Sequence, residues 1–428
     1  FGMIGSGISA VSLVSIPGNV GNENLYYFQF ILGTIVGYLF IANILIPIFF
    51  KQKLVSIYTY LQNRFGEVTY KTGASFFMVS QSFGAALRLL LSVKILQSAF
   101  FDKMNIPPAI TILILWLYTN KSGIKTIVWT DALQSLFLIL VIVISIYSIV
   151  KALDTGEKSV LNAIIADPKF NFFDFDWNSG TNFFKQFISG FLITIALVGL
   201  DQSMMQKTLT VSNASDAKRN VLTFSFFIAS AQTLFLFLGV YMFASQKGLQ
   251  LPMENGKYTQ PDELFPTLTM NYFGSIGVIA FFIGVVASTF ASIDSCIAAL
   301  TTSLSYDFFD FEKKSEAQRK KLKNVVLIAV NMIMYLIVLA FWNSEGSIIN
   351  SIFKVAGYTY GPLLGIYLIG LFTEIKFREK WVPYMSILAP ILTFGLNYWL
   401  EKQGFSLGFL NILINAIFTM ILLWLIKK

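Results

Sequence analysis

Residues 6–22 read SGISAVSLVSIPGNVGN and combine the hydrophobicity of a membrane helix with four serines, three glycines and a proline. Glycine and serine weaken a helix, because glycine leaves the backbone unfixed and serine competes for its hydrogen bonds. Irregular backbone at membrane depth is tolerated only where it lines a site. We therefore predict that Gly5, Ser6 and Gly7 interrupt the first helix, so that backbone oxygens near Gly5 and Ile8 turn inward.

The composition is typical of a polytopic membrane protein. Of the 428 residues, 55% are hydrophobic and only 13% are charged, and the mean hydropathy is +0.67. One soluble core could not bury so much apolar surface. The single cysteine, Cys296, excludes an internal disulfide, and no cluster of thiols or imidazoles is present to hold zinc, iron or copper. The absence of histidine excludes histidine-based acid–base chemistry.

Twelve stretches are apolar and long enough to be candidate membrane spans. We place them at residues 1–22, 25–50, 69–101, 106–119, 124–150, 184–206, 219–246, 273–304, 323–343, 348–373, 380–400 and 406–427. The first span begins at Phe1 without an initiator methionine or a signal-peptide n-region. We therefore expect an N-terminally trimmed chain that lacks at least one upstream segment.

The basic residues are distributed unevenly between the two sets of loops. If the loop at 51–68 is cytoplasmic, alternation of the spans places 20 of the 31 Lys and Arg residues inside. This distribution follows the positive-inside rule, so the net charge of +8 indicates membrane topology and not a nucleic-acid surface. We expect a multi-pass protein of a bacterial inner (plasma) membrane that contacts the lipid bilayer and no nucleic acid.

Polar residues lie at four places within the predicted spans, where each costs about 2.5 to 3.5 kcal/mol at a helix centre. These places are the first-span cluster, Asp131 with Gln134, the stripe of Ser288, Ser292 and Ser295, and Arg88. An isolated serine in a membrane helix most often packs or bonds to the preceding turn, but three in a stripe weaken that explanation. A carboxylate, several hydroxyls and bare carbonyls are together the hard oxygen ligands that a small alkali cation needs.

Five stretches, in the right order through nearly the whole chain, resemble the sodium/solute symporter family of sodium-coupled sugar, proline and sialic acid carriers. They are GISAVSLVSIPGNV at 7–20, YTYLQNRFG at 58–66, GIKTIVWTDALQ at 123–134, DQSMMQKTLT at 201–210 and ASIDSCIAALTTSLSYDFF at 291–309. The resemblance implies an all-α, five-plus-five inverted-repeat transporter core with a discontinuous first helix. The first repeat would be 1–150 and the second 184–373, followed by two additional C-terminal spans at 380–428. Family members usually carry one additional helix before the first repeat, which agrees with the expected truncation.

The resemblance also implies sodium ligands. The family's site between the first and eighth spans falls on the carbonyls of Gly5, Ile8 and Ser288 and on the hydroxyl of Ser292. Where many relatives have paired serines, this chain has Ala291-Ser292, so one expected hydroxyl is absent. A second site, found in some relatives, would fall on Asp131, Ser292, Asp294 and Ser295. Asp294 lies about 100° around the helix from Ser295, so a packing or gating hydrogen bond is an equal alternative for it.

By the same resemblance, Ser9, Ser12 and Tyr27 should face a central substrate cavity, with Gln29 and Gln81 as further candidates. Arg88 could clamp a carboxylate, because a guanidinium offers a bidentate fork. Sialic acid carriers of the family bind the acid group with an arginine on the third span, about one turn before the position of Arg88. An ion pair within the bundle or a snorkelling head is therefore the alternative for Arg88.

These observations predict a sodium-coupled secondary active symporter with sodium as its cofactor. It would import a small polar organic solute, namely a sugar, a sugar acid such as sialic acid, or a carboxylate, by alternating access. The alternative from another class is a non-transporting membrane sensor of the same fold, against which the lack of a signalling domain within these residues counts. An enzyme ranks third, because without histidine no constellation of nucleophile, base or metal is apparent.

Overall fold

The computed structural model describes residues 9–54, 56–98, 140–145, 147, 165, 170–244, 253–254, 256–309, 311 and 314–428. Within these ranges, the side chains at 244, 290–292, 294 and 295 are not described. Six described helices are long and apolar enough to cross a membrane, or seven spans if a bent pair counts as one. The six are Tyr27–Lys51, Glu67–Leu96, Ala214–Phe243, Glu316–Ala340, Ile348–Phe372 and Gly408–Leu425.

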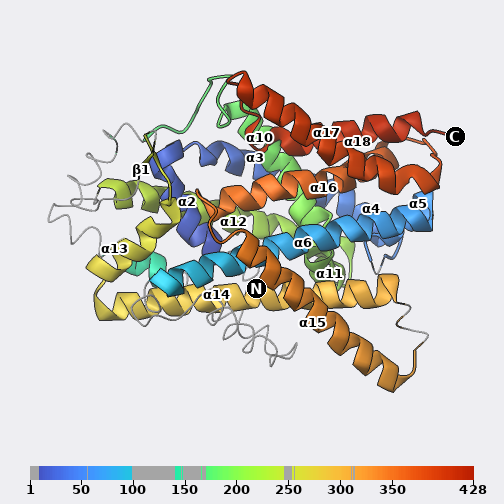
Figure 1. Ribbon diagram of the computed structural model, residues 1–428, viewed down its shortest axis with the longest axis horizontal. Helices are drawn as coiled ribbons and strands as arrows, with labels where there is room; N and C mark the ends of the chain where they lie inside the picture. Colours follow the sequence, from blue (N-terminus) through green and yellow to red (C-terminus); the bar gives the residue numbers. More distant parts are fainter. Residues whose placement is uncertain are drawn as a thin grey trace.

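Most of the long helices run side by side along one direction of the molecule (Figure 1). The first half contains α2 (Ala10–Glu23), α3 (Tyr27–Phe40), η1 (Ile41–Leu45), α4 (Ile46–Lys51), α5 (Thr59–Phe65) and α6 (Glu67–Leu96). The middle contains α10 (Phe183–Thr194), η4 (Ile195–Gly199), α11 (Gln202–Leu209), α12 (Ala214–Ala244), η5 (Pro261–Glu263), α13 (Leu264–Tyr272), α14 (Gly274–Ser303) and η6 (Leu304–Phe308). The last part contains α15 (Glu316–Ala340), α16 (Ile348–Phe372), η8 (Glu379–Trp381), α17 (Val382–Lys402), η9 (Gly408–Leu410) and α18 (Asn411–Leu425).

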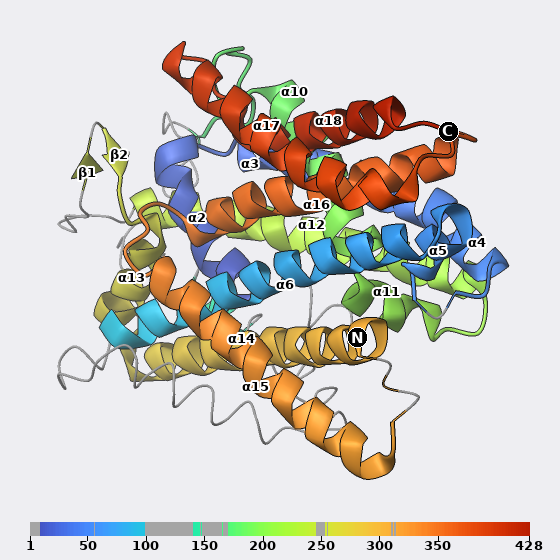
Figure 2. The ribbon, with the colours of Figure 1, turned by 45° about the vertical axis from the view of Figure 1, so that its right-hand side comes forward.

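Two outer layers enclose the centre of the molecule. In both views α17 and α18 lie along one edge and α14 and α15 along the other, with α6 and α16 between them (Figures 1 and 2). A short antiparallel ribbon of β1 (Met253–Glu254) and β2 (Lys257–Tyr258) projects at one end of the helices. This arrangement leaves α6 and α16 to line the interior rather than the surface.

Glycines allow the backbones of α3 and α10 to approach closely. A Cβ at Gly33 would overlap the carbonyl oxygen of Phe187, and a Cβ at Gly190 would overlap that of Phe30. Gly37, four residues after Gly33, faces α10 in the same way. Small residues at such spacing are typical of helix pairs in membranes, where packing takes the place of the hydrophobic effect.

A second glycine stripe joins α16 to α18. Cβ atoms at Gly357 and Gly361 would overlap the amide groups of Asn411 and Asn415. The Asn415 Nδ2 donates to the carbonyl oxygens of Gly357 (3.0 Å) and Tyr358 (2.8 Å). The C-terminal hairpin of α17 and α18 is therefore fixed to α16 by close packing and by hydrogen bonds between the helices.

The predicted spans agree with the described helices, except that the span at 184–206 is not a single straight helix. Phe183–Gly199 and Gln202–Leu209 meet at a bend of 65°. The reason is Asp201, whose Oδ1 accepts hydrogen bonds from the backbone N–H groups of Ser203 (2.9 Å) and Met204 (3.1 Å) and so begins a new helix. The predicted span at 106–119 and most of that at 124–150 lie outside the described residues.

Candidate functional site

The described part of the first span begins a helix within the membrane-spanning sequence. Ser9 is extended, with φ −105° and ψ 160°, and its side chain accepts a hydrogen bond from the Ser12 N–H at 3.4 Å. The Ala10 N–H donates to the Ser288 Oγ at 2.7 Å. One N–H group of the first turn of α2 is thus bonded to the middle of α14.

A helix is broken at Asp201, which is 1% exposed. Besides the two N–H groups of α11, its carboxylate accepts hydrogen bonds from the Tyr360 hydroxyl (2.9 Å) and the Gln81 Nε2. The Ser203 hydroxyl is a further donor. Asp201 therefore connects the start of α11 to α6 and α16.

A cavity of about 180 Å³ lies between the start of α2 and the break at Asp201. Its wall includes Ser9 and Ser12 of α2, Thr34 of α3, Ser80, Gln81 and Arg88 of α6, Asp201 and Lys207 at α11, Cys296 of α14, and Phe353 and Tyr360 of α16. Ser9, Ser12, Gln81 and Arg88 are residues that the sequence assigned to a substrate site. The structure brings these four together around one space.

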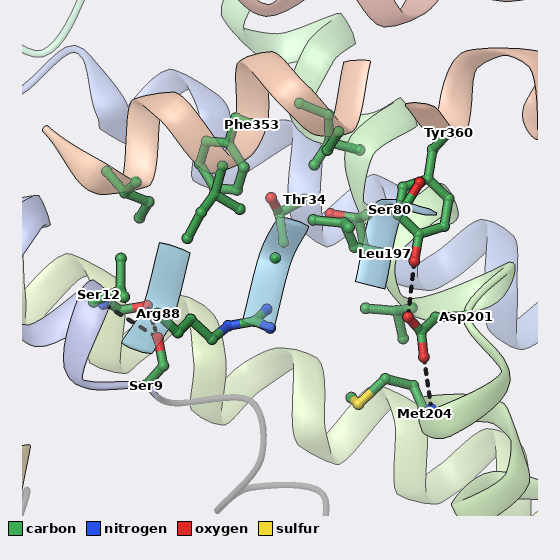
Figure 3. Close-up of a pocket in the computed structure, with 18 of the residues that line it drawn as sticks. Ser9, Ser12, Thr34, Ser80, Arg88, Leu197, Asp201, Met204, Phe353 and Tyr360 are labelled. Carbon is green, nitrogen blue, oxygen red and sulfur yellow. Dashed lines mark hydrogen bonds between the residues drawn. The ribbon is translucent and has the colours of Figure 1, made fainter. Parts of the chain in front are cut away.

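Arg88 reaches into the middle of the cavity. Its guanidinium lies between Ser9 and Ser12 on one side and Asp201 on the other (Figure 3). Its Nη1 is 3.9 Å from the Cys296 Sγ, and in the described part of the chain it forms no salt bridge. The head therefore neither snorkels to a membrane interface nor pairs with a described carboxylate.

Tyr27 and Gln29 do not line this cavity, contrary to the expectation for both. The Tyr27 ring stacks on Phe30 at 5.1 Å and on Phe353 at 6.4 Å between centroids, and so lies one layer behind the cavity wall. The Gln29 amide donates to the Thr181 carbonyl (2.8 Å) and accepts from the Asp174 N–H (3.0 Å). Because both ends of this amide are used by the loop before α10, Gln29 holds that loop in place.

The predicted sodium ligands are described only in part. Ser288 is buried, and its hydroxyl accepts from Ala10, which leaves its carbonyl as the predicted ligand. Gly5, Ile8 and Asp131 lie outside the described residues, as do the side chains of Ser292, Asp294 and Ser295. Sodium binding by these groups stays a prediction.

Several residues of the cavity were missed by reasoning from the sequence. Asp201 and Lys207 lie in the motif DQSMMQKTLT, which served only to support the family resemblance, although an acidic residue inside an apolar span was itself a signal. Cys296 was considered only for disulfides and metals. Tyr360 carries no signal, because its role depends on a hydrogen bond to a residue 159 positions away.

Comparisons with known proteins agree with this geometry. A sequence model of the sodium:solute symporter family matches residues 1–379. The human sodium/iodide cotransporter is 25% identical over 379 residues, which cover 85% of this chain and 57% of that protein. The sodium/sialic acid symporter NanT of Aliivibrio fischeri is 23% identical over 423 residues, covering 92% of this chain and 78% of its own.

A solved structure of a Na⁺-coupled sialic acid symporter, in a substrate-bound outward-open state, has a similar fold. The two structures superimpose with a TM-score of 0.78 at 19% sequence identity. The match covers 100% of this chain and 89% of the chain in that structure. The likeness confirms the predicted all-α transporter fold. The chain spans little more than half the length of the human relative, at 57%.

Proposed function

Since the chain belongs to the sodium:solute symporter family, we propose that it is a sodium-coupled carrier that imports a small polar organic solute by alternating access. The observation that supports this proposal most is the polar cavity between the start of α2 at Ser9 and the bend of α10–α11 at Asp201. Carriers with discontinuous membrane helices bind their solutes where such helix ends meet. The proposal makes the protein a carrier and not an enzyme, in a bacterial plasma membrane.

The proposed sodium site joins the first and eighth spans through Gly5, Ile8, Ser288 and Ser292. The hydrogen bond from Ala10 to Ser288 supports it, because it holds the start of α2 against α14 beside these positions. Asp131, Ser292, Asp294 and Ser295 are the proposed ligands of a second sodium ion. Both curated relatives are sodium carriers by name, which favours sodium over a proton as the coupling ion.

The proposed solute is a sugar, a sugar acid or a carboxylate, bound by Ser9, Ser12, Gln81 and Arg88. Two hydroxyls and an amide suit a polyhydroxylated solute, and the guanidinium suits an acidic group. One of the relatives is a sialic acid carrier by name, and sialic acid has both hydroxyl groups and an acidic group.

The test begins with a thermal-shift screen of sugars, sugar acids and carboxylates, with and without sodium, because a ligand of the folded state raises its apparent stability. Uptake of the solute into proteoliposomes should then require sodium, and a potassium or pH gradient should not replace it. Counterflow of labelled solute separates a carrier from a sensor. Equal uptake from sodium-free buffer under a proton gradient would exclude the proposal.

The variant Ser292→Ala addresses the ion site itself. Loss of the hydroxyl should raise the sodium concentration needed for half-maximal uptake. An unchanged sodium dependence would show that another face of α14 holds the ion.

A further inference from the structure

Lys207 is a cation of the cavity wall that the family resemblance does not explain. It lies on α11, and its Nζ is buried without a hydrogen-bond partner among the described residues. An ammonium group withdrawn from water costs several kcal/mol unless an anion or several acceptors replace the water. The position of this group therefore calls for a negatively charged partner.

The carboxylate of the cavity is already occupied by other donors. Asp201 accepts five hydrogen bonds, from the Ser203 N–H and hydroxyl, the Met204 N–H, the Tyr360 hydroxyl and the Gln81 amide. It forms no salt bridge within the described part of the chain, where the ion pairs are Arg64–Glu374 and Lys71–Glu67. Among the described side chains of the wall, two cations, Arg88 and Lys207, thus share the cavity with one carboxylate, whose hydrogen bonds all come from neutral groups.

Both cations belong to the wall of the same cavity. The Arg88 Nη1 is 3.9 Å from the Cys296 Sγ, and Lys207 lines the cavity together with these two residues. The two side chains come from different helices, α6 and α11, while Cys296 belongs to α14. A single acidic group bound beside Cys296 would therefore lie close to the guanidinium, in a cavity whose wall also carries the ammonium.

We propose that Arg88 and Lys207 together bind the acidic group of the transported solute, so that the cavity selects organic acids over neutral sugars. This inference rests on the proposed function and narrows its solute class. The guanidinium supplies two parallel N–H donors to a carboxylate, and the ammonium supplies a point charge. The hydroxyls of Ser9, Ser12 and Thr34, also in the wall, remain for the uncharged part of the solute.

The single cysteine of the chain provides a direct test, because Cys296 lines the same cavity as the two cations and its Sγ is 3.9 Å from the Arg88 Nη1. The purified protein is treated with two methanethiosulfonate reagents of similar size, the anionic 2-sulfonatoethyl and the cationic 2-(trimethylammonium)ethyl compounds. The Cys296 thiol first loses its proton to water. The thiolate then attacks the divalent sulfur of the reagent, so that a mixed disulfide forms and methanesulfinate leaves. The ratio of the anionic to the cationic rate is divided by the same ratio for free 2-mercaptoethanol.

In the wild type we expect a normalised ratio above one. In Lys207→Met it should fall by about tenfold or more, as expected for removing one charge at short range in a partly screened site. Lys207→Arg should keep the wild-type ratio. Lys218→Met, which removes an exposed lysine of α12, is the matched control and should leave the ratio unchanged.

A second measurement uses pairs of probes that differ in an acidic group, D-glucuronate with D-glucose and lactate with propane-1,2-diol. Only the acids should raise the melting temperature, and Lys207→Met should weaken that binding about tenfold, while Lys207→Arg keeps it. Stabilisation by a neutral member as strong as that by its acid would overturn the proposal. The labelling ratio decides the outcome if no probe of the panel binds.

Three labelling results would also overturn the proposal, namely a ratio of one in the wild type, an unchanged ratio in folded Lys207→Met, and failure of both reagents to reach Cys296. Neither readout involves sodium or transport. Charge selectivity without sodium-dependent uptake would leave this inference standing and remove the proposed function. Sodium-dependent uptake of a neutral sugar would support the proposed function and overturn this inference.

Discussion

Asp201 shows how one buried side chain can fix the geometry of a helix break. Its two oxygens accept hydrogen bonds from α11, α6 and α16, so one side chain ties three helices together at the break. A carboxylate suits this position because it accepts from several donors at once and favours the positive end of the α11 dipole. The bend, and with it one wall of the cavity, depends on this residue.

Two substitutions separate the parts of this network. Asp201→Ala leaves the Tyr360 hydroxyl, the Gln81 amide and two N–H groups without their acceptor, and should lower the free energy of unfolding by about 3 kcal/mol. Tyr360→Phe removes one donor and leaves the others in place, at a cost of about 1 kcal/mol. Thermal unfolding in detergent gives the comparison. Equal effects of the two changes would mean that Asp201 does not organise the break.

Asp262 gives the outer end of the protein a dependence on pH. It lies in η5, outside the spans, and its Oδ2 accepts from the Ile348 N–H at 2.8 Å, at the first residue of α16. Burial raises the pKa of this carboxyl from 3.8 to about 6. The folded protein therefore holds this proton more tightly than the unfolded chain does. The contribution of protonated Asp262 to the free energy of unfolding is therefore complete below pH 4 and is lost as the pH rises through 6.

We expect Asp262→Asn to remove that dependence, since asparagine stays neutral and still offers an oxygen to Ile348. A shift of about two pKa units corresponds to roughly 3 kcal/mol. The melting temperature of the variant should therefore rise relative to that of the wild type as the pH is raised from 4 to 7. Parallel curves for the two proteins over this range would contradict the assignment.

The individual residues show where reasoning from the sequence succeeds and where it fails. The family resemblance placed Ser9 and Ser12 at the cavity, whereas Arg88 was a candidate because a charged group inside an apolar span needs a polar surrounding. Gln29 follows the same rule, but its partners Thr181 and Asp174 lie in a loop some 150 positions later. Which polar surrounding a residue finds is decided by tertiary contacts that no local pattern contains.

At the scale of the elements, glycine stripes decide which helices lie in contact. Gly33 and Gly190 bring α3 and α10 together, and Gly357 and Gly361 receive the asparagines of α18. In the first pair a backbone carbonyl oxygen, and in the second a side-chain amide, fills the space where a side chain would otherwise stand. The two pairs therefore tolerate little added volume.

A pair of glycine substitutions tests this directly. Gly33→Ala places a methyl group against the Phe187 carbonyl, which belongs to the backbone and cannot rotate away, and should destabilise the protein by about 1 to 3 kcal/mol. Gly395→Ala on α17 meets nothing within 4 Å and should stabilise by roughly 0.5 to 1 kcal/mol through helix propensity. Opposite shifts in melting temperature are expected. Similar shifts for both would show that close packing of α3 on α10 is not needed.

The spans themselves were predictable, because about 20 apolar residues in a row have few alternatives in a bilayer. The bend at Asp201 was not predicted, since the apolar run continues through Gly199 and Leu200 and hides the interruption. In the first span the clustered serines and glycines predict an interruption at Gly5, Ser6 and Gly7, which lie outside the described residues. A single capping carboxylate gives a weaker signal than a change of composition, although it bends the helix by 65°.

At the scale of the whole molecule, the outer ends of α2 and α16 are joined by a chain of amides. The Asn19 Nδ2 donates to the Asn350 Oδ1 at 3.1 Å, and the Asn350 Nδ2 donates to the Glu23 Oε1 at 2.9 Å. Below this chain Phe30 and Phe353 stack at 4.8 Å between centroids, over the cavity. If the loop at 51–68 is cytoplasmic, these contacts close the external side, and a carrier must break them to admit its solute.

A cross-link between Asn19→Cys and Asn350→Cys, in a Cys296→Ser background, should therefore stop transport. A short bifunctional methanethiosulfonate holds the two outer ends together, so the solute cannot enter from outside, and a reducing agent should restore uptake. The control pair is Lys354→Cys with Asn411→Cys, on α16 and α18, where the Asn411 Nδ2 donates to the Lys354 carbonyl at 3.1 Å. Because the glycine stripe already holds α16 on α18, that cross-link should leave uptake nearly unchanged. Undiminished uptake with the first pair fully cross-linked, measured at matched protein density in proteoliposomes, would mean that α2 and α16 do not separate during the cycle.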